Sequence, residues 1–300
     1  MKNGKIGYAV VGLGIGKAHV DAAAAYDRCE LIAVCDLIQE KMDKVVERYP
    51  GTLTYMNFDE MMKNPDIDIV SICLPSAMHA EYAVKAMEAG KNVLCEKPIT
   101  VNYKLSVEMA EEAKKQGKIL NIGVCNRYNK SVEMLRQLVE EGKFGKIYHV
   151  YCSFRECRSI PGLGGPFTTK SQSGGGALID WGIHFLDLIL YILGGAKIET
   201  ATADAYSEMA KDMKSYKYHN MWAEDTSDVE HGTNDVDDFI TGYVRTDKAS
   251  ISLNGAWAQN LDQRDMYIDF LGDKAGARLD YGGKFQFFDG STLETTRPEY

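Results

Sequence analysis

Apolar runs and helix-like stretches alternate through roughly the first 125 residues of the chain. Strands are predicted at the short apolar runs, residues 5–14, 29–36, 52–56, 67–75, 92–96 and 119–125. Helices are predicted between them, at residues 17–26, 37–49, 57–65, 80–90 and 101–117. Such alternation is typical of a parallel sheet covered by helices. We therefore expect a doubly wound α/β domain at residues 1–124.

The pattern changes after Cys125. A helix is predicted at residues 131–142 and an alternating strand at residues 145–156, followed by a glycine-rich loop, a further helix and strands separated by polar stretches. This predicts an α+β domain at residues 125–300 with a large, mainly antiparallel open sheet. The polar stretch at residues 207–238 is interpreted as a long loop, and its length makes it a candidate lid or contact surface.

Composition narrows the classes of function. The 300 residues are 45% hydrophobic with a formal net charge of -9, which indicates a soluble globular protein and argues against nucleic acid or an anionic membrane as a partner. The seven cysteines form no CxxC pair and several lie in apolar runs, so we expect free thiols in a reducing cytoplasm. No apolar run approaches the length of a membrane span.

Three glycines, Gly12, Gly14 and Gly16, stand between the first predicted strand and the first helix. A glycine turn at this place lets backbone amides and the helix N-terminus approach a pyrophosphate. The GxGxxG spacing would require a glycine at the position of Lys17, so the loop is either a variant or one residue shorter. An ordinary tight turn would also explain the glycines.

Asp36 closes the second predicted strand, where an acid can accept hydrogen bonds from the adenosine ribose. Its charge would repel the 2′-phosphate of NADP, and the following Leu37 and Ile38 supply no cation to attract that phosphate. NAD is therefore predicted in preference to NADP. A strand-ending turn aspartate is the structural alternative.

The stretches VVGLGIGKAHV, AVCD, residues 68–100 and residues 174–195 together resemble a known family. It is the family of NAD(P)-dependent Rossmann-fold dehydrogenases that includes glucose-fructose oxidoreductase, inositol dehydrogenase and the rhizopine catabolism protein. The resemblance runs in order from about residue 5 to residue 195. It continues more loosely through residues 235–258 and 268–281.

In this family the segment corresponding to Glu96-Lys97-Pro98 lies beside the nicotinamide. The resemblance implies that the cofactor contacts Gly12, Gly14, Ile15, Gly16, Asp36, Leu74, Pro75, His79, Glu96 and Lys97. It implies that Lys97 also reaches the substrate, and that the Pro98 peptide bond is cis, which proline tolerates at small cost. The residues alone allow His79 an equally simple packing role at a helix N-terminus.

A second chemical element is IDWGIHFLD, residues 179–187. On an α-helix Asp180 and His184 share a face one turn apart, so a carboxylate and an imidazole can address one small molecule. His184 is the candidate base for a hydroxyl proton, and Lys97 can stabilise the developing alkoxide. Asp180 would orient the substrate or tune this pair, and Asp187 is interpreted as a packing or surface acid. Two potential ligands without a third do not make a metal site, so no metal is predicted.

Four further side chains, Arg127, Tyr128, Arg155 and Trp181, are weaker candidates for lining the substrate pocket. Each also has an ordinary explanation as a salt-bridge or core residue.

The predicted function is an NAD-dependent oxidoreductase acting on a secondary alcohol of a cyclic polyol, sugar or glycoside. A redox-assisted glycosidase and a non-catalytic NAD-binding sensor are the alternatives, and retention of Lys97, Asp180 and His184 disfavours the sensor. The resemblance implies a homodimer or homotetramer formed through the C-terminal sheet. Family members continue for some tens of residues after the strand near residue 281, so a truncated chain or a shortened member is expected from the end at Tyr300.

Overall fold

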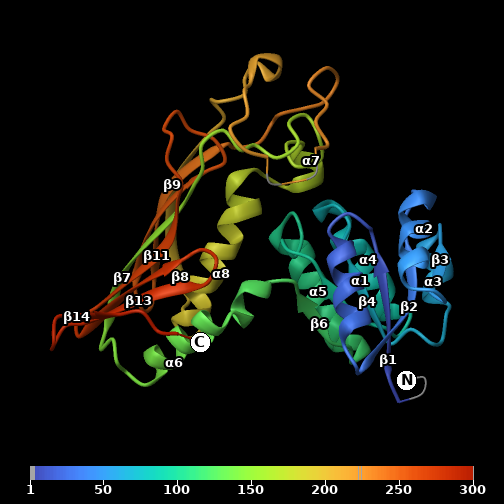
Figure 1. Cartoon of the computed structure of the whole chain (residues 1–300), viewed down its shortest axis with the longest axis horizontal. Coiled ribbons are helices and arrows are strands. Elements are labelled where there is room, and N and C mark those ends of the chain that lie inside the picture. The colour runs from blue at the N-terminus through green and yellow to red at the C-terminus, as the bar shows by residue number, and fades with distance from the viewer. Residues whose placement is uncertain (1–3, 222, 224, 300) are drawn as a thin grey trace. The chain divides into compact units, whose positions relative to one another are not determined.

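The computed structural model of this chain describes residues 4–221, 223 and 225–299. The chain divides into two compact units, Met1–Gly123 and Val124–Tyr300, limits that lie one residue from the expected boundary. The first unit runs from blue to green in Figure 1, and the second from green to red.

The first unit contains a parallel sheet of six strands. They are β1 (Ile6–Val11), β2 (Cys29–Cys35), β3 (Leu53–Tyr55), β4 (Ile69–Ile72), β5 (Asn92–Cys95) and β6 (Leu120–Ile122). The strands pair in the order β3-β2-β1-β4-β5-β6. This is the order of a doubly wound dinucleotide-binding sheet, and the direction of winding reverses between β1 and β4.

Helices cover both faces of this sheet. They are α1 (Gly16–Ala25), α2 (Gln39–Arg48), α3 (Phe58–Met62), α4 (His79–Glu88) and α5 (Tyr103–Gln116). Val10 packs in one buried cluster with residues of α1 and α2, whereas its neighbours Ala9 and Val11 pack in another with residues of α3, α4 and α5. Successive strand side chains point to opposite faces, so the continuous apolar runs reflect burial on both sides.

The second unit is built on an eight-stranded sheet. Its strands are β7 (Ile147–Arg155), β8 (Ile198–Tyr206), β9 (Phe239–Thr246), β10 (Ser250–Ala256), β11 (Asp265–Gly272), β12 (Ala275–Asp280), β13 (Lys284–Asp289) and β14 (Glu294–Thr296). The order is β14-β13-β12-β11-β7-β10-β9-β8, and every pairing is antiparallel except β7 with β10. The expected α/β fold with a mainly antiparallel second sheet is confirmed.

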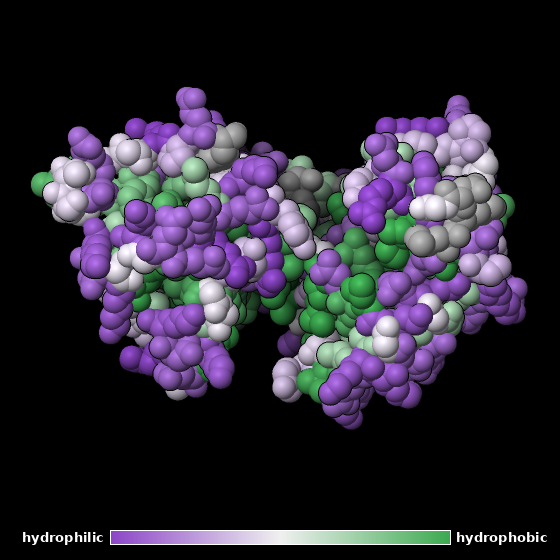
Figure 2. Space-filling view, turned by 90° about the horizontal axis from the view of Figure 1, so that it is seen from below, coloured by the Kyte–Doolittle hydropathy of each residue, from purple (hydrophilic) through white to green (hydrophobic). Residues whose placement is uncertain are grey.

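Helices α6 (Lys130–Glu140), α7 (Lys170–Ser173) and α8 (Ile183–Ile192) belong to the second unit. Phe185, Leu188 and Ile192 of α8 form a buried cluster with Val150 and Phe154 of β7. Tyr151 lies between Val150 and Cys152 on β7, so its side chain points to the other face, and it is 48% exposed. The surface drawn in Figure 2 is mostly hydrophilic with smaller hydrophobic areas.

The helix that carries Asp180 and His184 differs from the expected regular α-helix. Residues Leu178–Gly182 form a turn of π-helix, and only from Ile183 does α8 begin. Asp237 explains the start of this helix, because its carboxylate accepts the amides of Gly176 and Leu178 at 2.9 and 3.2 Å. A π-turn is wider than an α-turn, so Asp180 and His184 are not related by the simple four-residue repeat.

We expected no apolar stretch to approach the length of a membrane span, and one stretch contradicts this expectation by its length and composition. The helical stretch Lys170–Ile192 is long and apolar enough to cross a membrane, and half of its most apolar window is buried. Its apolar residues Phe185, Leu188, Ile189 and Ile192 belong to the core of the second unit. A core helix satisfies the same length and hydropathy test, so the stretch is weak evidence for a membrane span.

The seven cysteines are free thiols, as the sequence indicated. Four of them, Cys35, Cys73, Cys95 and Cys152, are buried, whereas Cys125 is exposed. Burial raises the pKa of the Cys35 thiol to about 11, so this group stays protonated at neutral pH.

Candidate active site

The residues expected to bind a dinucleotide lie at the carboxyl ends of four neighbouring strands of the first unit. Gly12 follows β1, Asp36 follows β2, Leu74 lies beyond β4 and Glu96 follows β5. In an open parallel sheet this edge is the usual ligand site, at the point where the strand order reverses. The strand order therefore gathers residues from four separate parts of the sequence.

Each glycine of the first loop has its own steric reason. Gly12 has a φ of +83°, and a Cβ there would overlap the carbonyl oxygen of Cys73. At Gly16 a Cβ would lie 2.9 Å from Cγ1 of Val10, so this glycine lets α1 pack closely on the sheet. Gly14 is exposed, and beyond its chain neighbours no described atom lies within 4 Å of its Cβ position. Turn, close packing and open approach are the three glycine roles of a dinucleotide loop.

Gly14 and Gly16 should therefore respond differently to substitution. Gly14→Val should weaken NAD binding about 10-fold or more, or 1.4 kcal/mol, because the side chain would occupy the open approach. Gly16→Val should instead destabilise the first unit by about 1–3 kcal/mol through overpacking against Val10. Calorimetric NAD titration and urea unfolding measure the two effects, and equal behaviour of the variants would contradict the assignment of roles.

Asp36 is held beside the glycine loop by two backbone amides. Its Oδ2 accepts the Leu13 N–H at 2.7 Å, and its Oδ1 accepts the Ile38 N–H at 2.9 Å. Each carboxylate oxygen has a further lone pair for a ribose hydroxyl. The neighbouring Leu37 side chain is 82% exposed and supplies no positive charge.

A chain of polar contacts behind the edge holds Glu96, and sequence reasoning missed three of its members. Glu96 Oε1 contacts His19 Nε2 at 2.8 Å, and His19 Nδ1 contacts Ser71 Oγ at 2.9 Å. Ser71 Oγ in turn lies 2.5 Å from the Tyr8 hydroxyl. Glu96 Oε2 accepts the Lys97 N–H at 3.1 Å. The histidine in GKAHV was the available signal, since it directly precedes Val20 on the helix that follows the glycine loop.

Burial alone would raise the pKa of Glu96, but the hydrogen bond and charge of His19, with the amide and charge of Lys97, lower it below its usual value of 4.5. Because the pKa of Glu96 is lower in the folded than in the unfolded protein, its ionised carboxylate stabilises the fold at pH values above the pKa of the unfolded chain. That stabilisation is lost as the pH falls through the pKa of the folded protein.

His19→Ala is expected to lower the free energy of unfolding by about 1–3 kcal/mol at pH 7, because Glu96 loses a buried partner. The difference in stability between wild type and Glu96→Gln should shrink as the pH falls below 4.5. Urea unfolding over an acid series measures both effects. Glu111→Gln, at an exposed site on α5, is the matched control. A gap that widens on acidification would contradict the prediction.

His79 joins two of the loops at this edge. It is 1% exposed, and its Nδ1 and Nε2 each lie 2.8 Å from a carbonyl oxygen, of Pro98 and Leu74 respectively. Only the protonated ring can donate to both carbonyls, since a neutral imidazole has one N–H. This burial favours the packing interpretation, in which His79 positions the Glu96-Lys97-Pro98 turn. The Lys97–Pro98 peptide bond is cis, as the resemblance implied.

The remaining cofactor candidates lie in the loops around this edge. Ile15 is 61% exposed beside Gly14, and Pro75 is exposed after β4. Leu74 is half-buried and packs on the core. The half-buried Lys97 follows Glu96 directly. The first unit thus presents an open loop, an anchored acid and a lysine along one edge.

Asp180 and His184 have different surroundings in the second unit. Asp180 is 6% exposed, and its Oδ2 accepts the Nε1–H of Trp257 at 3.2 Å. His184 is half-buried, with its Nδ1 3.4 Å from Nδ2 of Asn126. Tyr281 joins this group, because its hydroxyl lies 3.3 Å from the same Asn126 nitrogen.

Asn126 is a neighbour of His184 that sequence reasoning missed. When the amide nitrogen of Asn126 faces Nδ1 of His184, the neutral imidazole carries its proton on Nε2. Turning the amide by half a rotation places Oδ1 toward Nδ1–H and leaves Nε2 as a proton acceptor. The orientation of one amide therefore decides whether the outer nitrogen of His184 donates or accepts.

Arg127 pairs with Asp187, which is the ordinary salt-bridge role that the sequence allowed. Its Nε donates to Asp187 Oδ2 at 2.7 Å, its Nη2 donates to Oδ1, and its guanidinium lies 5.0 Å from the Tyr191 ring centre. The hydrogen bond that Arg127 donates to Asp187 raises the pKa of Arg127 above its usual range. Tyr128, by contrast, is 69% exposed.

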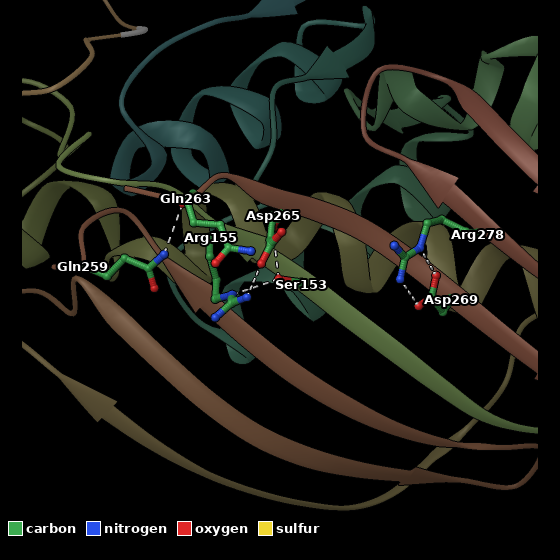
Figure 3. A network of polar contacts seen from close by, with 7 residues as sticks. All are labelled: Ser153, Arg155, Gln259, Gln263, Asp265, Asp269 and Arg278. Atoms are coloured by element: carbon green, nitrogen blue, oxygen red, sulfur yellow. Dashed lines mark hydrogen bonds and ion pairs between the residues drawn. The ribbon is translucent and has the colours of Figure 1, made fainter. Parts of the chain in front are cut away.

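The two remaining substrate-pocket candidates, Arg155 and Trp181, contact other residues of the second unit. Figure 3 shows Arg155, at the end of β7, directed toward Asp265 and Ser153, with which it forms an ion pair and a hydrogen bond. Trp181 packs against two buried apolar clusters. A substrate role for any of these side chains stays a prediction.

These features fit a dinucleotide, because the approach at Gly14 is open and the Asp36 carboxylate beside it can accept hydrogen bonds from a ribose. The doubly wound sheet and its ligand edge, followed by a second unit with a half-buried histidine, define the class of nicotinamide-dependent oxidoreductases. The protein-family model described as "Oxidoreductase family, NAD-binding Rossmann fold" matches residues 6–124. A second family model, "GFO/IDH/MocA C-terminal domain", matches residues 132–278. The chain belongs to the Gfo/Idh/MocA family, which confirms the resemblance seen in the sequence.

Known proteins support the same assignment. The chain is 32% identical over 282 residues to the D-glucoside 3-dehydrogenase of Escherichia coli (strain K12), a match covering 93% of this chain and 78% of that protein. It spans 57% of the length of two further relatives.

Solved structures similar to this chain include complexes with the reduced cofactor. The WlbA dehydrogenase from Chromobacterium violaceum, in complex with NADH and UDP-GlcNAcA, is 27% identical with a TM-score of 0.76, over 93% of this chain and 75% of that one. Levoglucosan dehydrogenase, in complex with NADH and levoglucosan, is 21% identical with a TM-score of 0.83, over 98% and 80% of the two chains. The second similarity shows the fold alone.

Proposed function

We propose that this protein is an NAD-dependent dehydrogenase that oxidises a secondary alcohol of a sugar, cyclic polyol or glycoside to the ketone. The observation that carries the proposal is the ligand edge of the first unit, where Asp36 is anchored beside the open Gly14. The similarity of almost the whole chain to a D-glucoside 3-dehydrogenase supports the substrate class. The exposed Leu37 beside Asp36 supports NAD over NADP.

The chain's own groups have distinct tasks in this reaction. Bound NAD would supply the acceptor for the hydride of the alcohol carbon. His184 Nε2 takes the hydroxyl proton when the Asn126 amide presents its oxygen to Nδ1–H. The ammonium of Lys97 stabilises the alkoxide oxygen, and Asp180 orients the helix that carries His184 through its bond to Trp257. The products are a ketone, NADH and one proton.

A substrate panel tests this function. Purified protein is incubated with NAD and with inositols, hexoses and methyl glycosides, and NADH formation is followed by absorbance while mass spectrometry identifies the product. We expect NADH and ketone in equal amounts with at least one member of the panel. Cleavage of a glycoside without net NADH would instead identify a redox-assisted glycosidase. NAD binding without turnover of any compound would favour a sensor.

We also propose that the protein works in the cytoplasm as a homodimer or homotetramer formed through the eight-stranded sheet. The free thiols support the compartment, and the exposed Tyr148, Tyr151 and Tyr206 on the strands of this sheet support the interface. Tyr151→Glu should therefore lower the molar mass measured by light scattering toward that of one chain. A monomeric wild-type protein would contradict the proposal.

A further inference from the structure

Three separate segments of the second unit meet beyond the end of β7. One is residues 156–160, which follow β7, and one is residues 216–219 of the long connection between β8 and β9. The third is residues 260–262, between β10 and β11. The long connection, orange in Figure 1, lies on the same side of the second unit as the green loop after β7. Each segment contributes one side chain to a cluster of three potential metal ligands.

Arg158 holds the three segments together. Its carbonyl accepts the His219 N–H at 3.0 Å, its guanidinium donates to Oδ1 of Asn260, and it lies 5.6 Å from the ring centre of Tyr216. Arg158 is also a non-glycine residue with a positive φ of 50°, a conformation that costs energy and needs support from its surroundings. The junction is therefore built by contacts that do not involve the metal-binding side chains themselves.

Two tyrosines reinforce the junction. The Tyr216 hydroxyl accepts the Ile160 N–H at 3.4 Å, and the Tyr218 hydroxyl accepts the Leu163 N–H at 3.1 Å. Tyr216 is partly buried, and burial raises the pKa of its hydroxyl, so it remains protonated. The backbone that carries His219 is thus fixed against the segment that carries Cys157.

The side chains of Cys157, His219 and Asp262 converge at this junction. One ligand atom from each, a sulfur, a ring nitrogen and a carboxylate oxygen, lies within 4.8 Å of the other two. His219 Nε2 is 3.7 Å from Asp262 Oδ1. Ligands of a tetrahedral zinc ion, with bonds of about 2.0–2.3 Å, lie roughly 3.5 Å apart. The half-buried Cys157 and the two exposed partners need only small side-chain rotations to reach that spacing.

We propose that Cys157, His219 and Asp262 form a zinc-binding site that clamps residues 216–219 to the end of β7. Thiolate and imidazole select zinc over calcium or magnesium, which prefer oxygen ligands. Three protein ligands leave a fourth position for water. On binding, the Cys157 thiol releases its proton to the solvent and a sulfur–zinc bond forms, so there is no change of oxidation state. Sequence reasoning predicted no metal because it considered Asp180 and His184 and found no third ligand beside them. Cys157, His219 and Asp262 are far apart along the chain, so no motif links them.

Metal binding by the untagged full-length chain tests the site. After removal of metal with a chelator, equilibrium dialysis against zinc should give one ion per chain. Cobalt used as a probe should show a thiolate charge-transfer band. Cys157→Ser should abolish that band, and both Cys157→Ser and His219→Ala should weaken zinc affinity about 10-fold or more.

The chain offers two matched controls. Cys125→Ser removes an exposed thiol elsewhere in the second unit, and His231→Ala removes a histidine that contacts Asp228 at 3.4 Å in the same connection. Both variants should bind zinc like wild type. Absence of bound zinc, or zinc binding that survives both Cys157→Ser and His219→Ala, would overturn the proposal.

A measurement on the wild-type protein avoids any effect of substitution on folding. Zinc should slow alkylation of Cys157 but not of Cys125, as read by mass spectrometry of the digested protein. Equal alkylation rates of Cys157 with and without zinc would overturn the proposal.

Discussion

His184→Ala is expected to lower turnover roughly 100-fold or more while NAD binding stays unchanged, because the reaction loses its base and the cofactor edge lies in the first unit. The wild-type rate should fall at acidic pH, where the imidazole is protonated, and the variant should lack this acidic limb. Turnover with a verified substrate at saturating NAD, together with calorimetric NAD titration, measures these effects. Normal turnover would remove His184 from the mechanism.

Lys97→Ala should cause a loss of similar size, since the developing alkoxide would lose a positive charge. Lys104→Ala is the matched control, because Lys104 is an exposed lysine of the same unit on α5. The double variant Lys97→Ala with His184→Ala should lose less than the two single effects combined if both groups act on one bound substrate. Strict additivity would indicate that they act independently.

Asp36→Ser combined with Leu37→Arg is expected to reverse the preference of the protein from NAD to NADP. Wild type should bind NAD about 100-fold more tightly, since a hydrogen bond to a charged group contributes about 1.5–3 kcal/mol and the carboxylate repels the added phosphate. The variant removes that repulsion and supplies a cation at an exposed position. Titration with both cofactors at fixed ionic strength measures the change.

Two controls separate the charge of Asp36 from its structural role. The carboxylate also accepts the Leu13 and Ile38 amides, so Asp36→Ser should loosen the loop as well as alter selectivity. Asp36→Asn keeps the size and removes the charge, whereas Asp43→Asn removes an exposed acid on α2. The affinity for NADP should rise in Asp36→Asn but not in Asp43→Asn. Equal affinity of wild type for the two cofactors would contradict the role of Asp36.

Local patterns predicted the fold class well. Apolar runs and helical repeats identified the elements of the first unit, because burial on both faces of a parallel sheet leaves a signal within a few residues. The loop glycines were found in the same way, although the displaced third glycine needed the structure to explain it. A glycine is needed at position 16 because a Cβ there would lie too close to Val10.

Contacts between distant residues were not predictable from those patterns. His19 of α1 contacts both Ser71 of β4 and Glu96, which directly follows β5, and Asn126 reaches His184 from a different segment of the second unit. The start of the helix that contains the π-turn at Leu178–Gly182 is fixed by Asp237, a residue about sixty positions further along the chain. None of these contacts leaves a periodic signal in the chain.

The sequence by itself determined the elements, the dinucleotide loop, the acid at Asp36 and the family, because each depends on residues that are close together or on a motif of fixed spacing. Only the tertiary structure decided the partners of Glu96 and His184, the buried bridging position of His79 and the junction at Cys157, His219 and Asp262. Strand order and loop packing bring those groups together, and such geometry is a property of the whole folded unit rather than of any local stretch.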